Sequence, residues 1–359
     1  MDYSLRCTKC SHAEADDAFR CSRCGSILEV RIDYSSIMIG KAFRSRRVKN
    51  SKYLLLFPIK RFEMEGGEGG TRLVSHNIGA QKVMFKMETE NPTGSFKDRG
   101  SAVEISKAVE LGRNSVCCAS TGNMGMSVAR YAKLAGISAT IFISKDASKE
   151  KIARIKSYGA RLVKVDGDFN TALRNAEAFA RKDRTFMCGD YHFRKEGQKS
   201  VAYEIIDQCG SPDFIFLPVG NATLLSAVYK GLSEYVRFGL LDSMPRIVAV
   251  QSEKCDPLVR AYMSGRHLEY VKPKTVADAI AVGYPTFGLE GIAALKKTHG
   301  IAVNVSEDQL RDAILMLEEK GIGAEAGGAA GFAGFMKFYE NDREMFRGKK
   351  TVIVITGNN

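Results

Sequence analysis

The amino-acid sequence predicts an α/β protein made of parallel β-sheets with helices on both faces. Its 359 residues are enough for two domains, and its 45% hydrophobic and 26% charged residues are typical of a globular protein. Apolar runs of strand length alternate with amphipathic helical patterns along most of the chain. Continuous apolar strands separated by such helices are typical of parallel sheets that are buried on both faces.

The alternation of strands and helices is regular from about residue 81 onward. We expect strands at 82–88, 115–120, 139–144, 160–166, 213–219, 246–251 and 351–356. We expect helices at 98–112, 123–136, 147–158, 170–182, 223–236, 306–320 and 326–341. The apolar runs are far shorter than a membrane span, and the N-terminus lacks the apolar core of a signal peptide. We therefore expect a cytoplasmic protein that does not bind membranes.

Two CxxC pairs near the N-terminus predict a metal site. CTKC at 7–10 and CSRC at 21–24 are separated by ten residues, a spacing that lets four thiolates surround Zn²⁺ tetrahedrally. The alternative is two chance pairs of surface thiols. A site closed by four cysteines has no open position for a substrate, so we expect a structural zinc ribbon over residues 1–32. Its ligands would be Cys7, Cys10, Cys21 and Cys24.

The chain is basic, with 53 Lys and Arg against 41 Asp and Glu and a net charge of +12. Such a charge suits nucleic acid or phosphorylated small molecules. The basic residues are scattered through amphipathic segments, and their densest cluster, 44–49, is short and has no interleaved aromatic residues. These features favour a small phosphorylated ligand over nucleic acid.

Three turns with small polar residues follow predicted strands, at 119–123, 217–223 and 355–357. At the first two, hydroxyls, amides and backbone N–H groups gather at a helix N-terminus, which attracts anions. Each of the first two turns alone is explained equally well by an ordinary helix cap, and the third alone is better explained by a plain terminal strand of the core. Because ligands bind at the carboxyl ends of strands in open α/β sheets, the three turns together predict one site for an anionic cofactor.

Lys97 stands in NPTGSFKDRG (91–100), where a helix begins. It is either a solvated lysine on that helix or the amine that holds a cofactor. Pyridoxal phosphate (PLP) needs an amine for its aldehyde, a cup for its phosphate and a partner for its ring nitrogen. A lysine combined with phosphate-binding turns therefore favours PLP as the cofactor.

The motif around Lys97 resembles the PLP-lysine motif of threonine synthases, within the fold-type II (tryptophan synthase β-like) family of PLP enzymes. The resemblance extends along most of the chain through GGEGGTRLV (66–74), STGN (120–123), FRKEGQKSVAYEI (193–205), PVGNA (218–222), VAVQ (248–251) and the terminal TG. The ribbon is similar to the N-terminal extension of many microbial threonine synthases.

The resemblance implies two parallel-sheet α/β domains with PLP in the cleft between them, and a homodimer. The large PLP-binding domain would comprise 33–80 and 190–359. The smaller, mobile domain would comprise 81–189 and carry the Schiff-base lysine.

The resemblance also implies a role for each site residue. Lys97 would hold PLP and act as the catalytic acid and base. Asn123 would bond the ring oxygen, and the hydroxyl of Thr356 would meet the pyridine nitrogen. The phosphate would lie in the cup formed by Gly220, Asn221, Ala222 and Thr223. The substrate would be bound by Ser120, Thr121 and Arg194, with Arg194 anchoring a substrate phosphate.

The implied activity is the conversion of O-phospho-L-homoserine and water to L-threonine and phosphate. One departure concerns the segment before Arg194, where threonine synthases usually carry Asn-Ser-x-Asn and this chain has Cys188-Gly189-Asp190-Tyr191. A threonine/serine dehydratase or a β-replacement enzyme acting on phosphoserine is therefore kept as an alternative on the same fold. A more remote alternative is a zinc-ribbon protein that binds nucleic acid.

Overall fold

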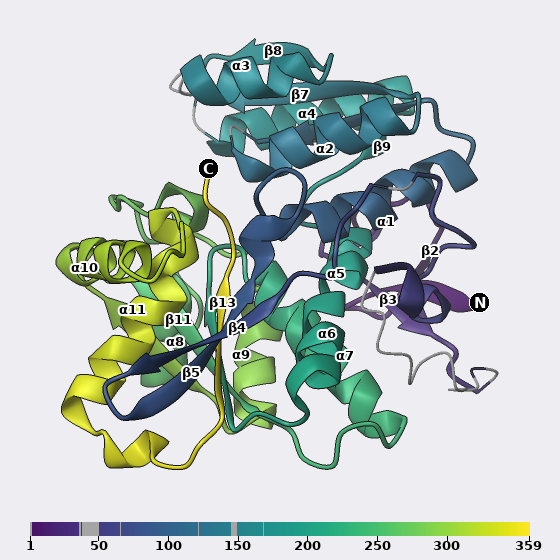
Figure 1. Ribbon diagram of the computed structural model, residues 1–359. Helices are drawn as coiled ribbons and strands as arrows, with labels where there is room; N and C mark the ends of the chain where they lie inside the picture. The colour runs from purple at the N-terminus through teal and green to yellow at the C-terminus, as the bar shows by residue number, and fades with distance from the viewer. Residues whose placement is uncertain are drawn as a thin grey trace. The chain divides into compact units, whose positions relative to one another are not determined.

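The computed structural model describes residues 2–35, 37, 50–64, 66–120, 122–144, 149–167 and 169–359. The chain divides into two compact units (Figure 1). Unit 1 contains residues 1–69, 91–93 and 97–198. Unit 2 contains residues 70–90, 94–96 and 199–359.

Unit 1 begins with a small antiparallel sheet in the order β2-β1-β3, which lies within residues 1–32, where a zinc ribbon is predicted. Alternate residues of β3, namely Leu28, Val30 and Ile32, are buried, as a sheet with one covered face requires. Its strands are β1 (Tyr3–Cys7), β2 (Ala13–Glu14) and β3 (Leu28–Ile32). A 3₁₀ helix, η2 (Asn50–Leu56), follows.

The second sheet of unit 1 has four parallel strands in the order β8-β7-β6-β9. Neighbouring residues of β6 point to opposite faces. Val116 and Cys118 belong to the hydrophobic cluster that includes α2, whereas Cys117 and Ala119 belong to the cluster that includes α4. Helices therefore cover both faces, which explains why these strands are apolar throughout.

The strands of this sheet are β6 (Ser115–Ala119), β7 (Ser138–Ser144), β8 (Arg161–Val165) and β9 (Phe186–Met187). The helices of unit 1 are α1 (Lys97–Glu110), α2 (Asn123–Leu134), α3 (Lys149–Ser157), α4 (Phe169–Asp183) and α5 (His192–Gln198).

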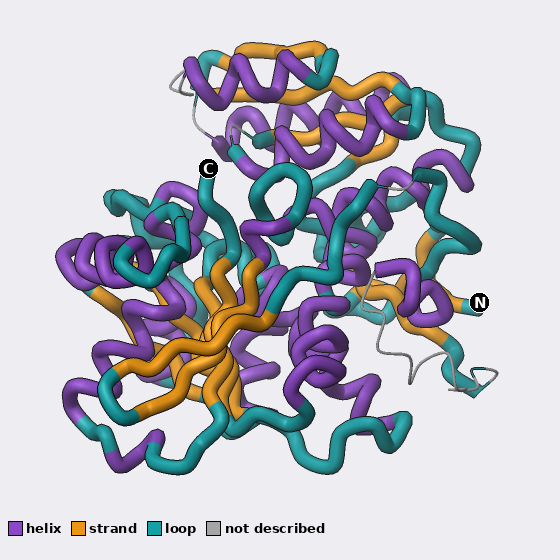
Figure 2. Tube along the Cα trace, in the orientation of Figure 1, coloured by secondary structure: helices purple, strands orange, loops and turns teal. Residues whose placement is uncertain are grey.

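Unit 2 is built on a six-stranded sheet in the order β12-β11-β10-β13-β5-β4 (Figure 2). Only the edge strand β4 is antiparallel to its neighbour within this sheet. Helix α11 packs against β10 and β13, with Phe332 and Phe335 in the same cluster as Phe216 and Ile353.

The strands of unit 2 are β4 (Leu73–Ile78), β5 (Gln81–Met87), β10 (Phe214–Pro218), β11 (Arg246–Ser252), β12 (Ile301–Val305) and β13 (Thr351–Ile355). The helices are α6 (Ser200–Cys209), α7 (Thr223–Arg237), α8 (Pro257–Ser264), α9 (Gly288–Lys297), α10 (Glu307–Glu318) and α11 (Ala326–Asn341). Three 3₁₀ helices complete it: η3 (Glu88–Glu90), η4 (Asp278–Ile280) and η5 (Glu344–Phe346).

The units differ from the domain boundaries expected from the sequence. We placed 81–87 in the smaller domain, but this strand pairs with β13 in the sheet of unit 2. We placed 33–69 and 190–198 in the large domain, but both segments belong to unit 1, as does the ribbon. Pairing with β13, a strand far away in the chain, decides the assignment of 81–87.

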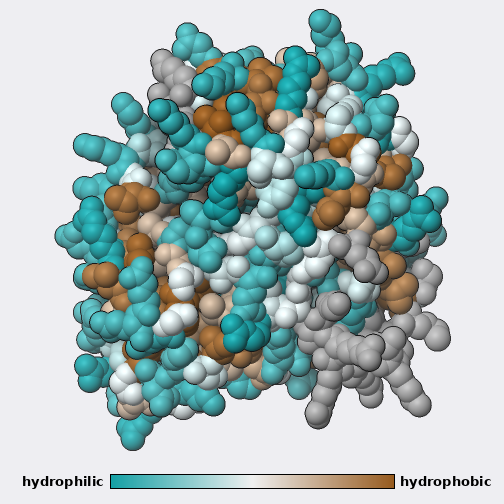
Figure 3. Space-filling model, turned by 45° about the horizontal axis from the view of Figure 1, so that its top comes forward, coloured by the Kyte–Doolittle hydropathy of each residue, from teal (hydrophilic) through white to brown (hydrophobic). Residues whose placement is uncertain are grey.

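Large hydrophobic side chains are mostly buried in both units. On the face shown in Figure 3, hydrophilic residues predominate and hydrophobic ones form small separate groups. Among the described residues, no helix combines the length and the hydropathy that a bilayer crossing requires.

Candidate active site

Lys97 is the first residue of α1, directly after a turn that is held by Asp98. The Asp98 carboxylate accepts hydrogen bonds from the backbone N–H and the hydroxyl of Thr93, both at 2.7 Å, and from the Ser127 hydroxyl at 2.6 Å. Gly94, in the same turn, has a φ of +78°, which glycine adopts without strain. The turn thereby fixes where the helix starts and where Lys97 lies.

Asp190 lies beside Lys97 in unit 1. Its Oδ1 is 4.0 Å from the Nζ of Lys97, and both side chains are largely buried. Asp190 follows strand β9 by way of Cys188 and Gly189, and the φ of Gly189 is +144°. Since residues with a Cβ rarely adopt that value, the backbone here requires glycine.

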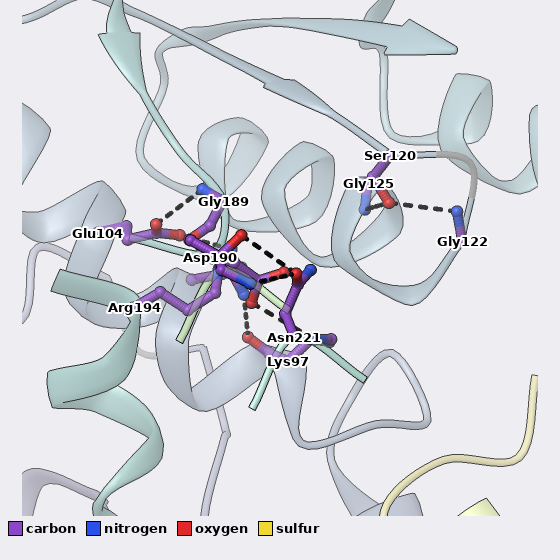
Figure 4. Close-up of polar contacts among 11 residues, drawn as sticks. Lys97, Glu104, Ser120, Gly122, Gly125, Gly189, Asp190, Arg194 and Asn221 are labelled. Atoms are coloured by element: carbon purple, nitrogen blue, oxygen red, sulfur yellow. Dashed lines mark hydrogen bonds and ion pairs between the residues drawn. The ribbon is translucent and has the colours of Figure 1, made fainter. Parts of the chain in front are cut away.

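Arg194, on α5, is fully buried and is engaged by protein groups on all three of its nitrogens (Figure 4). Its Nε donates to the carbonyl oxygen of Gly189 at 3.0 Å, and its Nη1 donates to that of Lys97 at 3.1 Å. Its Nη2 donates to the Ser101 hydroxyl at 3.1 Å and to the Glu104 carboxylate at 2.5 Å. This geometry conflicts with the predicted role of Arg194 as a substrate-phosphate anchor, because the guanidinium is already paired and shielded.

Glu104 is the buried partner of Arg194 and also accepts a hydrogen bond from the N–H of Gly189 at 2.9 Å. Burial raises the pKa of Glu104 to about 7, against the opposing effects of Arg194 and that N–H group. Glu104 is not among the site residues expected from the sequence. The available signal was a carboxylate two helical turns after Lys97, on a helix whose other residues there are small or apolar.

Ser120 follows strand β6 and caps the start of α2. Its Oγ accepts hydrogen bonds from the N–H groups of Gly122 at 3.2 Å and Gly125 at 3.0 Å (Figure 4). The hydroxyl retains its own proton, which it can donate to a ligand. Asn123 is the first residue of α2. Thr121, predicted to bind the substrate carboxylate, lies outside the described residues.

In unit 2, the predicted phosphate cup 220–223 connects β10 to α7. Ala222 precedes α7 with a left-handed backbone, φ +59° and ψ 12°, which costs a residue with a Cβ on the order of 1 kcal/mol. The side-chain oxygen of Asn221 accepts hydrogen bonds from the N–H and the hydroxyl of Thr286 at 3.2 and 3.1 Å. The conformation of the turn therefore depends on the left-handed backbone of Ala222 and on the hydrogen bonds between Asn221 and Thr286.

The first turn of α7 fits an anionic group. The 15-residue helix directs its N-terminal N–H groups toward the cup. Ser226, in this turn, has a buried Oγ without a hydrogen-bond partner among the described residues. A buried hydroxyl without a partner is costly, and a bound phosphate would supply an acceptor for it.

Thr356 follows β13, the strand next to β10, so its position and the cup are at the same edge of the sheet. The Thr356 carbonyl accepts a hydrogen bond from the N–H of Phe96 at 3.1 Å, and Ser95 forms a β-bridge with Gly357. The Oγ of Ser95 is buried and has no partner within the described parts of the chain. Unit 2 thus gathers the two turns that were predicted to hold the PLP phosphate and pyridine ring.

A second buried ion pair, in unit 2, holds Gly70 and Thr71 at the end of the glycine-rich stretch 66–70. The Nζ of Lys86 donates to Glu204 at 2.6 Å, to the side chain of Gln208 at 2.9 Å and to the Thr71 carbonyl at 2.7 Å. Glu204 also accepts from the N–H of Gly70 at 2.8 Å. Lys86 is fully buried, and its three donors all have acceptors, so its role is structural.

The four ribbon cysteines lie together in unit 1, with all their sulfur atoms within 4.8 Å of one another. Sγ of Cys7 is 3.5 Å from that of Cys24, and Sγ of Cys10 is 3.6 Å from that of Cys21. All four are free thiols. Four sulfur donors at these separations fit a tetrahedral zinc with Zn–S bonds of about 2.3 Å.

Comparisons with known proteins show the family of this chain. The family model of pyridoxal-phosphate dependent enzymes matches residues 64–357. The threonine synthase of Methanosarcina acetivorans is 35% identical, and the match covers 99% of this chain and 91% of that protein. The chain belongs to the threonine synthase family of PLP-dependent enzymes.

Other relatives extend the match. The threonine synthase of Methanocaldococcus jannaschii is 33% identical, and the match covers 98% of this chain and 91% of that protein. Among solved structures, maize serine racemase is similar with a TM-score of 0.71 and 23% identity, over 80% of this chain and 88% of that one. This structural similarity confirms the predicted α/β fold of PLP enzymes.

Proposed function

We propose that this protein is a threonine synthase, which converts O-phospho-L-homoserine and water into L-threonine and phosphate. The proposal rests on the similarity to threonine synthases, at 35% and 33% identity over 99% and 98% of this chain. The lysine turn and the phosphate cup, built from residues that the resemblance implicated, support it.

In this proposal the Nζ of Lys97 binds PLP and carries protons to and from the substrate carbons. The N–H groups and hydroxyl of the 220–223 turn hold the PLP phosphate, Asn123 bonds the ring oxygen, and Thr356 meets the ring nitrogen. PLP supplies an electron sink for the charge that develops on the substrate. Ser120 and Thr121 bind the substrate carboxylate.

A substrate screen tests the proposal. Purified protein loaded with PLP is given O-phospho-L-homoserine, O-phospho-L-serine, L-threonine and L-serine in parallel. We expect threonine and phosphate to form in equal amounts from phosphohomoserine. Formation of ketoacid from threonine or serine, without turnover of phosphohomoserine, would contradict the proposal.

A second candidate is a dehydratase or a phosphoserine-using β-replacement enzyme on the same fold. The contacts of Arg194 favour the dehydratase, whose substrate carries no phosphate, since Glu104 pairs with the guanidinium expected to bind a substrate phosphate. The carboxylate of Asp190 beside Lys97 adds a negative charge where a phosphate would be repelled. The screen described above separates the two candidates.

We further propose that the ribbon binds one structural Zn²⁺ through Cys7, Cys10, Cys21 and Cys24. The clustering of four thiols without an additional open position supports a structural rather than a catalytic metal. Metal analysis of the purified protein should give about one zinc per chain. A cytoplasmic location, where thiols stay reduced, and a homodimer are also proposed, and light scattering of the purified protein tests the dimer.

A further inference from the structure

The buried pair of Glu104 and Arg194 connects two separate segments of unit 1. Glu104 is on α1, which begins with Lys97, and Arg194 is on α5, which follows Asp190. The side chains of Arg194 and Glu104 are 0% and 1% exposed, and Nη2 of Arg194 is 2.5 Å from Oε2 of Glu104. Such a pair is costly to bury and is stable only when its remaining donors and acceptors are satisfied.

Those remaining groups bind backbone on both segments. Arg194 donates to the Gly189 carbonyl, and Glu104 accepts from the Gly189 N–H, so the pair holds both polar groups of this residue. A further guanidinium nitrogen donates to the Lys97 carbonyl. A planar fork with fixed donor directions is suited to this, whereas an ammonium group is not.

Two glycines, Gly100 and Gly197, allow α1 and α5 to pack closely together around Arg194. A Cβ at Gly197 would lie 2.1 Å from the carbonyl oxygen of Arg99, and one at Gly100 would lie 2.6 Å from Cγ of Arg194. Both helices therefore approach more closely than other residues would permit. The side chain of Arg194 therefore packs directly against the backbone of α1 at Gly100.

Arg194 binds the backbone of Lys97 itself and of Gly189, the residue before Asp190, and the side chains of Lys97 and Asp190 face each other. Lys97 and Asp190 present Nζ and Oδ1 at 4.0 Å, and each is at, or next to, a backbone group that Arg194 holds (Figure 4). We propose that Glu104 and Arg194 are positioning residues, which set the amine of Lys97 and the carboxylate of Asp190 relative to each other. The proposal rests on the proposed role of Lys97 as the PLP-binding lysine.

The test compares Glu104→Gln and Arg194→Lys with a matched pair of changes in unit 2. Lys199 and Glu234 form another buried ion pair at 2.9 Å, and Lys199→Met and Glu234→Gln serve as controls. Three quantities are measured: kcat and KM, the visible absorbance of bound PLP, and hydrogen exchange of the peptide over residues 187–192 in the protein without PLP.

Both unit 1 variants should lower kcat roughly ten- to a hundredfold with KM changed less than about threefold. They should also alter the ratio of the PLP absorbance bands and speed exchange at 187–192 at least about tenfold. The controls should lower the melting temperature and leave the spectrum and this peptide unchanged. An unchanged spectrum in both unit 1 variants would overturn the positioning role. An increase in KM confined to a phosphorylated substrate would overturn it in favour of direct phosphate binding.

Asp190→Asn keeps the proposal testable if the buried variants do not fold. This change removes the carboxylate and leaves the Glu104–Arg194 pair intact. It should alter the PLP absorbance ratio in the same direction with little change in melting temperature, and an unaltered ratio would refute the proposal. If borohydride reduction of the wild type fixes PLP to another lysine, both the proposed role of Lys97 and the positioning role fail. If PLP is fixed to Lys97 and the absorbance ratio is unaltered in the variants, the positioning role alone fails.

Discussion

Each unit contains a fully buried ion pair that holds a glycine, yet the two pairs serve different ends. In unit 2, Lys86 and Glu204 hold Gly70 and Thr71 at the end of the glycine-rich stretch 66–70. In unit 1, Arg194 and Glu104 hold Gly189 and the carbonyl of Lys97. Lys86 donates its hydrogen bonds to protein groups, so its role is structural. Arg194 instead binds backbone groups in the region where the side chain of Lys97 lies beside the carboxylate of Asp190.

This difference shows why burial alone does not identify a reactive lysine. Lys86 is 0% exposed and lies 2.6 Å from its carboxylate, with two further acceptors. Lys97 is 19% exposed, and its Nζ is 4.0 Å from Asp190. A lysine that must exchange its proton and bind a cofactor is suited to the second environment.

The largest expected effect is on Lys97. Lys97→Ala should remove covalent PLP attachment and lower turnover at least about a thousandfold, because the amine performs the chemistry. The melting temperature should hardly change, since the side chain contributes little packing. Lys133→Ala, an exposed lysine of α2, is the control and should behave like the wild type. Retained turnover in Lys97→Ala would refute the assignment.

Lys86→Met should show the opposite pattern. Removing the ammonium leaves Glu204 buried without a counter-charge, which should destabilise the protein by about 3–5 kcal/mol in urea unfolding. Lys82→Met, at an exposed position of the same strand, should change stability by less than about 0.5 kcal/mol. The folded fraction of Lys86→Met should still bind PLP covalently, and loss of that binding would mean that the two lysines are not functionally distinct.

Zinc removal should affect unit 1 more than unit 2. The ribbon packs on the rest of unit 1 through Arg20–Glu177 at 2.6 Å and through Tyr3 against Phe193. Cys24→Ser should lose the metal and speed hydrogen exchange in residues 2–35 and α5, with α7 and α11 unchanged. Cys209→Ser, a free thiol in unit 2, is the control. Equal loss of protection in both units would contradict a structural role confined to unit 1.

The smallest expected effect is a pH dependence from Glu104. Burial raises its pKa from 4.5 to about 7, so the folded state binds this proton more tightly than the unfolded state. Its contribution to stability is therefore complete below about pH 4.5 and is lost as the pH rises through about 7. The stability difference between wild type and Glu104→Gln should fall over this range in urea titrations. A difference that grows with pH would mean that Arg194 outweighs the cost of burial.

The sequence predicted the fold class, the expected strands and the ribbon cysteines well, because these depend on local patterns. Its boundaries failed where long-range pairing decides: nothing within 81–87 indicates that β13, more than 260 residues later, is its neighbour. The contacts of Arg194 could not be predicted for the same reason. The motif FRKEGQKS does not reveal whether a carboxylate on α1 contacts the arginine. The structure shows that Glu104 does so.

The most direct test of the central claim is borohydride reduction of the PLP-loaded protein followed by peptide mapping. Lys97 faces Asp190, whereas Lys86 and Lys199 are buried in ion pairs. We predict that the reduced cofactor is found on Lys97 alone, in about one copy per chain. Cofactor fixed to Lys86, to Lys199 or to several surface lysines would contradict the account.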